Sequence, residues 1–375
     1  MNVRFSEVQE QLRQAIRQFA RDKIAPRVRE MDEKDRFPQD LVQDMGLNGL
    51  LGLPVDKKWG GAGERWTTYV MAIEEISRVS AGVGVILAVH TSVGTMPIVT
   101  FGTEEQKARF VPSLAKGEHL GAFALTEPES GSDVRSMRTT ARRDGNDYVL
   151  NGMKAFVTNA TCADTFVTFA LAEKGITAFV VEKGSPGLSC GKQERKMGLG
   201  GTGTAPLIFD DVRVPEENRL GEEGEGFSVA IASLLGGRIV IGAQALGIAE
   251  AALELVVNYV TERRPYSRPL AAMPLVQSKL GEMVVQVEAA RLLVYRAAQL
   301  KEEGKPCAKE VAMAKLAASD AAMRLATEAV QLLGHEGCTK EYAVERLFRE
   351  AKVTQIYEGT NEIQRMVISK ELLRG

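Results

Sequence analysis

Ile356-Tyr357-Glu358-Gly359-Thr360-Asn361-Glu362, close to the C-terminus, lies between two segments with helical periodicity. Apolar residues recur at helical spacing in 341–355 before it and in 362–373 after it. Gly359 permits a break between the two predicted helices, because glycine tolerates left-handed backbone angles. The stretch therefore predicts a helix–helix break that carries the carboxylates of Glu358 and Glu362.

A carboxylate at such a break has two interpretations. It is either a solvated side chain at a helix end or a group that points into a cavity, because its backbone is not committed to a helical ladder. In an apolar cavity, desolvation raises the pKa of a carboxylate and makes it a useful proton acceptor for a weak carbon acid. The seven residues alone favour the solvated side chain.

Composition excludes several classes of protein. The 375 residues are 45% hydrophobic and 26% charged, with a formal net charge of -2, which is typical of a soluble protein and gives no support for nucleic-acid binding. Charged or glycine clusters interrupt each apolar run, and the N-terminus resembles neither a signal nor a transit peptide, so we expect no contact with a membrane. The 4 cysteines and 3 histidines are scattered, which predicts no metal site, no disulfide framework and a cytoplasmic location.

The hydrophobic period changes twice along the chain and predicts three domains. Residues 1–118 have helical patterns, 119–220 hold short strand-like runs between glycine, proline and asparagine turns, and 221–375 return to long helical patterns. We expect a mainly α fold with a central antiparallel β barrel or sandwich and a C-terminal four-helix bundle. The long C-terminal helices carry many alanines and leucines on more than one face. Either these helices pack against another subunit, or the alanines reflect the high helix propensity of alanine.

Two stretches of the predicted β domain are candidate ligand sites. Residues 123–133 (FALTEPESGSD) leave a strand and enter a turn whose N–H groups and hydroxyls suit an anion or a polar ring edge. A loop capped by its own serines explains this turn equally well. In 154–159 (KAFVTN), strand alternation places Phe156 and Thr158 on one face. There an aromatic ring can cover a flat ligand while a hydroxyl bonds the ligand's edge. The alternative is an ordinary sheet face with an aromatic residue and a threonine.

Two glycine-rich stretches have different interpretations. In Leu235-Gly236-Gly237-Arg238, an arginine beside glycines can approach a phosphate or a carbonyl closely. Residues 198–203 (GLGGTG) satisfy G-x-G-x-x-G but lead into a predicted strand at 207–209. A dinucleotide fingerprint opens a helix, so we reject this match.

Tyr357-Glu358-Gly359-Thr360 followed by Glu362-Ile363-Gln364-Arg365 resembles the C-terminal signature of acyl-CoA dehydrogenases. The resemblance extends over essentially the whole chain and is strongest to the short-chain (butyryl-CoA) branch. It implies the helical, β, helical architecture, FAD as cofactor and Glu358 as the catalytic base, with Glu362 as a control carboxylate.

The same resemblance implies the other site residues. Leu125 and Thr126 are expected at the isoalloxazine edge, Ser132 near the pyrophosphate or pantetheine, and Arg238 near CoA and the base. The set implied for FAD is Phe123, Leu125, Thr126, Ser132, Phe156, Thr158, Arg263, Tyr266, Gln331, Gly334, Thr360 and Glu362, and the set implied for the substrate is Ser132, Arg238 and Gly359.

Departures from the family pattern cluster in residues that resemble its adenosine-binding segments, which reach a neighbouring subunit's FAD. Tyr266-Ser267 replaces the usual Phe-Gly, Pro274 replaces a glutamine, and His335 replaces a glycine after Gln331-Leu332-Leu333-Gly334. We therefore expect FAD to bind in an altered way or more weakly. Cross-subunit binding of FAD implies at least a dimer, and the resemblance leads us to expect a homotetramer of paired dimers.

The implied reaction is α,β-dehydrogenation of a short-chain acyl-CoA to trans-2-enoyl-CoA. Glu358 removes the α-proton, the flavin accepts hydride from the β-carbon, and electrons pass to an electron-transfer flavoprotein. Residues 83–96 contain no arginine or lysine to pair a second carboxylate, which disfavours a glutaryl substrate. The alternatives are a dehydrogenase for branched or alicyclic acyl-CoA and a non-redox acyl-CoA-binding or assembly protein on the same scaffold.

Overall fold

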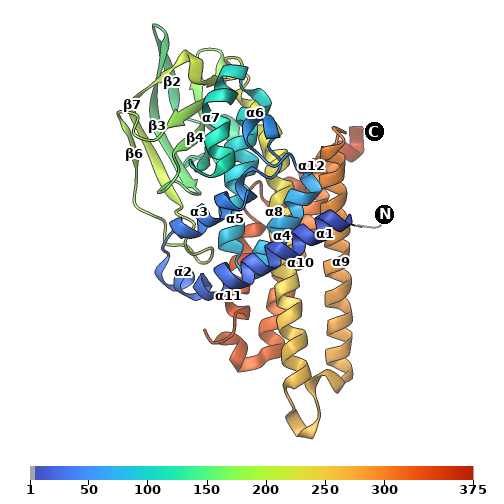
Figure 1. Cartoon of the computed structure of the whole chain (residues 1–375). Coiled ribbons are helices and arrows are strands. Elements are labelled where there is room, and N and C mark those ends of the chain that lie inside the picture. Colours follow the sequence, from blue (N-terminus) through green and yellow to red (C-terminus); the bar gives the residue numbers. More distant parts are fainter. Residues whose placement is uncertain (1–4, 375) are drawn as a thin grey trace.

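A computed structural model describes residues 5–374, and its elements follow the order helices, strands, helices (Figure 1). Side-chain caps explain where two of the first helices begin. Ser6 and Gln9 form a capping box at the start of α1, and Thr103 and Gln106 form another at the start of α7. The N-terminal helices are α1 (Glu7–Phe19), α2 (Val28–Lys34), α3 (Gln39–Leu47), α4 (Trp66–Val79), α5 (Ala81–Val89), α6 (Met96–Phe101) and α7 (Glu104–Lys116).

The β domain is one eight-stranded sheet with the order β6-β7-β3-β2-β4-β5-β8, and β1 pairs with β4 beside this path. Its strands are β1 (Gly121–Ala124), β2 (Thr140–Asp144), β3 (Asp147–Val157), β4 (Thr165–Ala172), β5 (Gly175–Glu182), β6 (Leu188–Cys190), β7 (Ala205–Pro215) and β8 (Arg219–Leu220). The predicted antiparallel pairing is found between most neighbouring strands, but β1 and β2 both pair with β4 in parallel. Neither strand reaches β4 through a hairpin, so no tight turn imposes the antiparallel direction.

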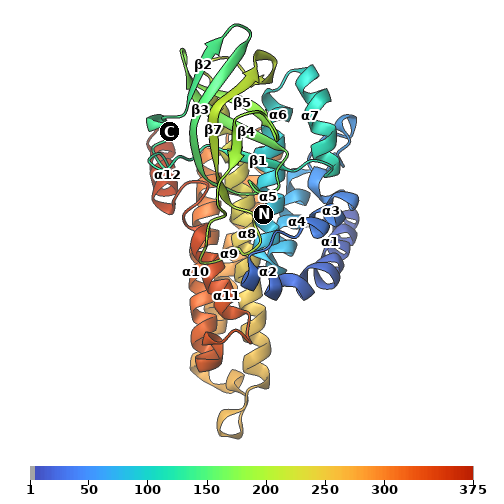
Figure 2. The same cartoon turned by 90° about the vertical axis from the view of Figure 1, so that its left-hand side faces the viewer.

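Three long helices dominate the C-terminal domain and lie side by side (Figures 1 and 2). The loop between α8 and α9 projects at the end of the bundle that points away from the sheet (Figure 2). Both α11 and α12 pack against α10, so the break between them is held against the bundle. The C-terminal helices are α8 (Gly226–Glu262), α9 (Pro274–Glu302), α10 (Ala308–Leu333), α11 (Val344–Thr354) and α12 (Asn361–Arg374).

Two helical stretches correct the expectation that every apolar run is interrupted. Ala81–Phe101 and Gly226–Glu262 are long and apolar enough to cross a membrane. Most of their apolar windows, 89% and 78%, lie buried inside the protein. Burial in the core therefore accounts for their composition.

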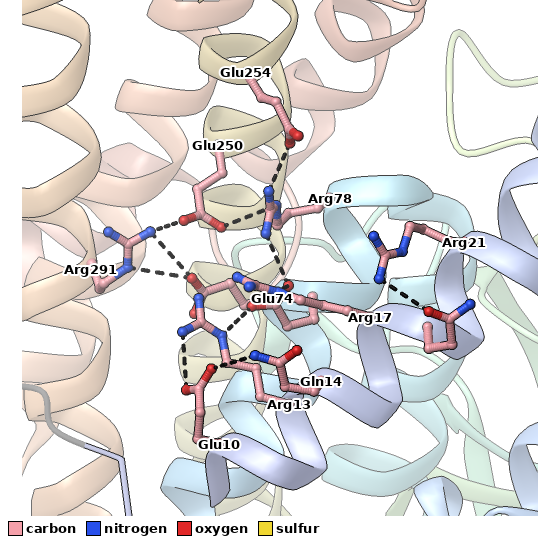
Figure 3. Close-up of polar contacts among 12 residues, drawn as sticks. Glu10, Arg13, Gln14, Arg17, Arg21, Glu74, Arg78, Glu250, Glu254 and Arg291 are labelled. Carbon is pink, nitrogen blue, oxygen red and sulfur yellow. Dashed lines mark hydrogen bonds and ion pairs between the residues drawn. The ribbon is translucent and has the colours of Figure 1, made fainter.

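A cluster of charged residues joins the N-terminal helices to the bundle (Figure 3). Glu74 and Glu75 on α4 are each only 2% exposed. Arg13 and Arg17 on α1 bond the two oxygens of Glu75 at 2.6 and 2.7 Å. Arg291 on α9 pairs with Glu74 and with Glu250 on α8. The cluster thus holds four helices together.

Candidate active site

The helix–helix break forms where it is predicted, between α11 and α12. Glu358 has a φ of 54° and Gly359 a φ of 90°, so two successive residues adopt left-handed backbone angles. Asn361 then begins α12, and its N–H donates to the Gln355 carbonyl at 2.9 Å. This geometry turns the Glu358 side chain away from both helix axes and into a cavity.

Glu358 is half-buried, and one of its two carboxylate oxygens is desolvated and unpaired. Its Oε2 atom is buried and has no hydrogen-bond partner within residues 5–374. Burial raises the pKa of Glu358 to about 7, and the nearby charges of Arg238 and Lys315 reduce this rise without cancelling it. The sequence alone favours a solvated carboxylate, so the structure reverses that interpretation.

Helix α8 makes room for this carboxylate at Gly237. A Cβ atom at position 237 would lie 2.3 Å from Glu358 Oε2 and 3.2 Å from a methyl carbon of Val93. A side chain at this position would therefore displace the carboxylate or the helix. The glycine that the sequence places beside Arg238 serves the close approach of a carboxylate.

A cavity of about 600 Å³ lies where the β domain, the N-terminal helices and the bundle meet. Val89 and Val93 supply an apolar wall from the N-terminal helices, and Arg135, Lys370 and Arg374 add positive charge. Nine of the predicted site residues line this cavity: Phe123, Leu125, Thr126, Ser132, Phe156, Thr158, Arg238, Glu358 and Gly359.

Phe156 and Thr158 reach the cavity by a geometry that alternation does not predict. The register between β3 and β7 shifts between Lys154 and Val157, and Phe156 has a φ of 54°. Its side chain is 65% exposed, which is high for an aromatic residue in a sheet. The irregularity turns Phe156 out of the sheet, so simple strand alternation is the wrong explanation of its position.

The turn that follows β1 combines both of its predicted interpretations. Ser130 Oγ donates to the Asp133 carbonyl at 2.7 Å and so caps the loop, whereas Ser132 lines the cavity. Glu127 accepts hydrogen bonds from the Thr139 N–H at 2.9 Å and from the buried Lys154 ammonium at 2.7 Å. This buried ion pair, which the sequence interpretation missed, fixes the turn against β3.

The remaining predicted site residues do not line this cavity. Arg263 directly follows α8, Gln331 lies in the last turn of α10 and Gly334 directly follows that helix, and none of the three lines the cavity. Thr360 and Glu362 lie at the start of α12, where the Thr360 hydroxyl accepts the Ile363 N–H at 3.3 Å. The side chain of Tyr266 lies outside the described residues. Contacts of these residues with FAD stay predictions.

Sequence reasoning also missed Lys315 and Gln364, which contact the helix break. Gln364 Nε2 donates to the Gly359 carbonyl at 2.9 Å, and Lys315 Nζ donates to the same carbonyl at 3.0 Å. Lys315 is the one charged residue in the alanine-rich run 311–319 of α10, and this pattern is the signal that could have identified it.

The fold and cavity define a helical, β, helical protein with an unpaired carboxylate, Glu358, at a cavity between its domains. Family models for the N-terminal, middle and C-terminal domains of acyl-CoA dehydrogenases match residues 6–118, 122–212 and 224–373. The chain therefore belongs to the acyl-CoA dehydrogenase family, whose members are oxidoreductases.

Individual relatives match the full chain. An acyl-CoA dehydrogenase of Bacillus subtilis (strain 168) is 56% identical over 97% of both chains. The structure of butyryl-CoA dehydrogenase from Megasphaera elsdenii has a TM-score of 0.98, with 44% identity and 100% of both chains covered. A chain in a structure described as the electron transferring flavoprotein of Acidaminococcus fermentans also has a TM-score of 0.98, with 46% identity and full coverage of both chains.

Proposed function

We propose that this enzyme catalyses the flavin-dependent α,β-dehydrogenation of a short-chain acyl-CoA to trans-2-enoyl-CoA. The observation that carries the proposal is the Glu358 carboxylate, which is desolvated, unpaired and turned into the cavity. A pKa of about 7 suits a base that must be ionised near neutral pH and still accept a proton from a weak carbon acid. A structural glutamate would instead have hydrogen-bond or ion-pair partners.

The residues present fit FAD. The Phe156 ring is exposed at the cavity, and the hydroxyls of Thr126, Thr158 and Ser132 line it, so an aromatic cover and polar partners for a flat ring are available. An acyl-CoA dehydrogenase from Bacillus anthracis with this fold is complexed with FAD. Bound flavin supplies the acceptor for the hydride that leaves the substrate β-carbon.

The chain's own residues carry the proton chemistry and the positioning. Glu358 removes the α-proton of the thioester. The Glu358 backbone N–H forms no hydrogen bond within the described part of the chain and is available to the thioester oxygen, where it stabilises the developing negative charge. Arg238 Nε donates to the Glu358 carbonyl at 3.0 Å and holds this peptide in place.

The cavity wall favours a short, uncharged acyl group. Val89 and Val93 face the space beside the base, and neither the α5 helix nor the π-helical turn at His90–Thr95 contains an arginine or lysine to pair a second carboxylate. The butyryl-CoA dehydrogenase of Megasphaera elsdenii, named for a short acyl substrate, matches the whole chain.

We infer that electrons pass to an electron-transfer flavoprotein and that the enzyme is a cytoplasmic homotetramer. The similar chain in the Acidaminococcus fermentans structure supports the electron acceptor. Leu275 and Val285 on α9, which are 81% and 67% exposed, support burial of this helix against another subunit. All four cysteines are free, which agrees with a reducing compartment.

An absorption spectrum of the purified protein tests the reaction. We expect a flavin band that bleaches when butyryl-CoA is added without oxygen. A flavin band that bleaches only with branched or alicyclic acyl-CoA would move the substrate class but keep the reaction. Absence of a flavin band after FAD is added back would contradict the proposed function.

A further inference from the structure

The peptide that carries Glu358 adopts a conformation that its own sequence disfavours. A glutamate at a φ of 54° is unusual, because the Cβ atom of an L-residue crowds the following carbonyl in left-handed backbone. Gly359, with a φ of 90°, extends the irregular turn by another residue. Such a turn persists only when surrounding contacts determine it.

Three side chains hold the two carbonyl groups of this turn. Arg238 Nε donates to the Glu358 carbonyl at 3.0 Å. Lys315 Nζ donates to the Gly359 carbonyl at 3.0 Å. Gln364 Nε2 bridges them, at 2.9 Å from the Gly359 oxygen and 3.4 Å from the Glu358 oxygen. Cations on α8 and α10 therefore hold successive carbonyls.

Lys315 is fully buried and is itself held in position. Its Nζ atom donates to Asn361 Oδ1 at 2.9 Å, and Asn361 Nδ2 donates to Asp320 at 2.8 Å. Gln355 Nε2 donates to the same Asp320 oxygen at 2.7 Å. Residues on both sides of the break are thus tied to α10, and the Lys315 ammonium lies between them.

The charge of Lys315 is directed at the break without a carboxylate partner. Within residues 5–374, Lys315 forms no ion pair at 4.0 Å or less, although burying an ammonium is costly. Burial lowers the pKa of Lys315 to about 8, while the negative charges of Glu358, Asp320 and Glu362 act against this effect and Arg238 adds to it. Arg238 and Lys315 are the cations that act on Glu358. At neutral pH the ammonium is still mostly charged.

We propose that Lys315 is a positioning residue, which fixes the Gly359–Thr360 peptide through the Gly359 carbonyl, so holds the turn that carries Glu358, and favours the ionised form of the base. This role rests on the proposed function of Glu358 as the base. Lys315 contacts the turn from outside the cavity and is not among the residues that line it. It acts on the reaction through Glu358.

The test removes the charge and follows Glu358 directly. Infrared titration of Lys315→Met follows the ionisation of Glu358 through its protonated-carboxyl band. The band is assigned to Glu358 because it is absent from Glu358→Gln. Loss of a nearby opposite charge should move the midpoint upward by about one unit. At pH 7 the rate of flavin reduction should fall about five-fold, because a smaller fraction of Glu358 is ionised. At high pH, the plateau of this rate should fall about ten-fold further, because the base is less well placed.

Lys301→Met is the matched control. Lys301 is a half-buried lysine on α9 that lies over the Trp66 ring at 4.6 Å and forms no hydrogen bond to the break. Its loss should leave the Glu358 midpoint unchanged. Lys315→Gln, which keeps a donor for the Gly359 carbonyl, replaces the methionine variant if that protein does not fold, and should shift the midpoint with a smaller loss of the plateau.

An unchanged midpoint in both Lys315 variants would overturn the proposal, and so would an equal shift in Lys301→Met. The infrared titration does not depend on turnover. A shifted midpoint in a protein whose wild type reduces no flavin with any acyl-CoA would therefore support the action of Lys315 on Glu358 while contradicting the proposed function.

Discussion

Two regions of this molecule hold a desolvated glutamate, Glu75 in one and Glu358 in the other, and the pKa shifts of these two carboxylates are opposite. In the cluster between α1, α4, α8 and α9 (Figure 3), Arg13 and Arg17 bond both carboxylate oxygens of Glu75. Burial acts to raise the pKa of Glu75, but hydrogen bonds from Arg17 and Arg13 and the charge of Arg78 outweigh it, and the pKa is lowered. At the helix break, Arg238 and Lys315 bond backbone carbonyls instead, so burial prevails and the pKa of Glu358 rises to about 7.

The difference lies in where the cations donate their hydrogen bonds. Arginines that bond the carboxylate oxygens keep Glu75 ionised and make the cluster a connection between helices. Cations that bond the backbone next to Glu358 leave its Oε2 atom without a partner and free to take a proton. The same residue types thus connect helices in one region and leave a carboxylate able to accept a proton in the other.

The largest expected effect comes from neutralising the unpaired glutamate. Glu358→Gln should bind acyl-CoA with little change but lower the rate of flavin reduction by about 10⁴-fold, because the proposed general base is lost. Anaerobic stopped-flow absorption measures the rate. Glu74→Gln, which changes a buried glutamate outside the cavity, is the control and should reduce flavin at the wild-type rate.

Bleaching of the Glu358→Gln flavin within ten-fold of the wild-type rate would contradict the assignment of the base. A slow Glu74→Gln protein with normal flavin content would instead mean that the two regions are coupled, and the contrast between them would fail.

The next effect is on stability. Arg291 lies between Glu74 and Glu250, so Arg291→Met leaves buried carboxylates without this cation and should lower the free energy of unfolding by about 3 to 4 kcal/mol. Urea denaturation measures it. Arg324→Met is the matched control, because Arg324 pairs with Glu282 at 3.0 Å on the surface, where both side chains are about 60% exposed, and its loss should cost about 0 to 1 kcal/mol.

The comparison would weaken if Arg291→Met and Arg324→Met were equally stable. Flavin reduction per folded Arg291→Met enzyme should be unchanged, since the cluster lies outside the cavity. A large loss of that rate would show that the cluster also positions the base.

Local patterns predicted the elements better than the environments of single side chains. The break at Gly359 follows from an interruption of helical periodicity, and α9 begins at Pro274 because proline suits the first turn of a helix. The parallel pairing of β1 with β4 depends on contacts between residues more than 40 positions apart, which periodicity does not record.

The site shows the same limit. The resemblance pointed to Glu358 as the base. Residues 356–362 by themselves favoured a solvated side chain, because the desolvation of the carboxylate depends on how three domains close around it. Phe156 was expected in the cavity for the wrong reason, since a register shift within β3 cannot be derived from alternation. Lys315 was missed because its target is a backbone carbonyl of a residue 44 positions away.

The smallest expected effect is a gain of stability at the active site that depends on pH. The unfolded chain releases the Glu358 proton near the ordinary glutamate value of 4.5, whereas the folded chain keeps it until about pH 7. Stability is therefore fully present below 4.5, and it falls as the pH rises through this window. Glu358→Gln carries no such proton, so at pH 8 it should be more stable than the wild type by about 2 to 3 kcal/mol, with a much smaller gain at pH 5. Urea denaturation of the two proteins at pH 5 and pH 8, with matched flavin content, measures both gains. Equal gains at the two pH values would contradict the prediction, because they would mean that the pKa of Glu358 is the same in the folded and the unfolded chain.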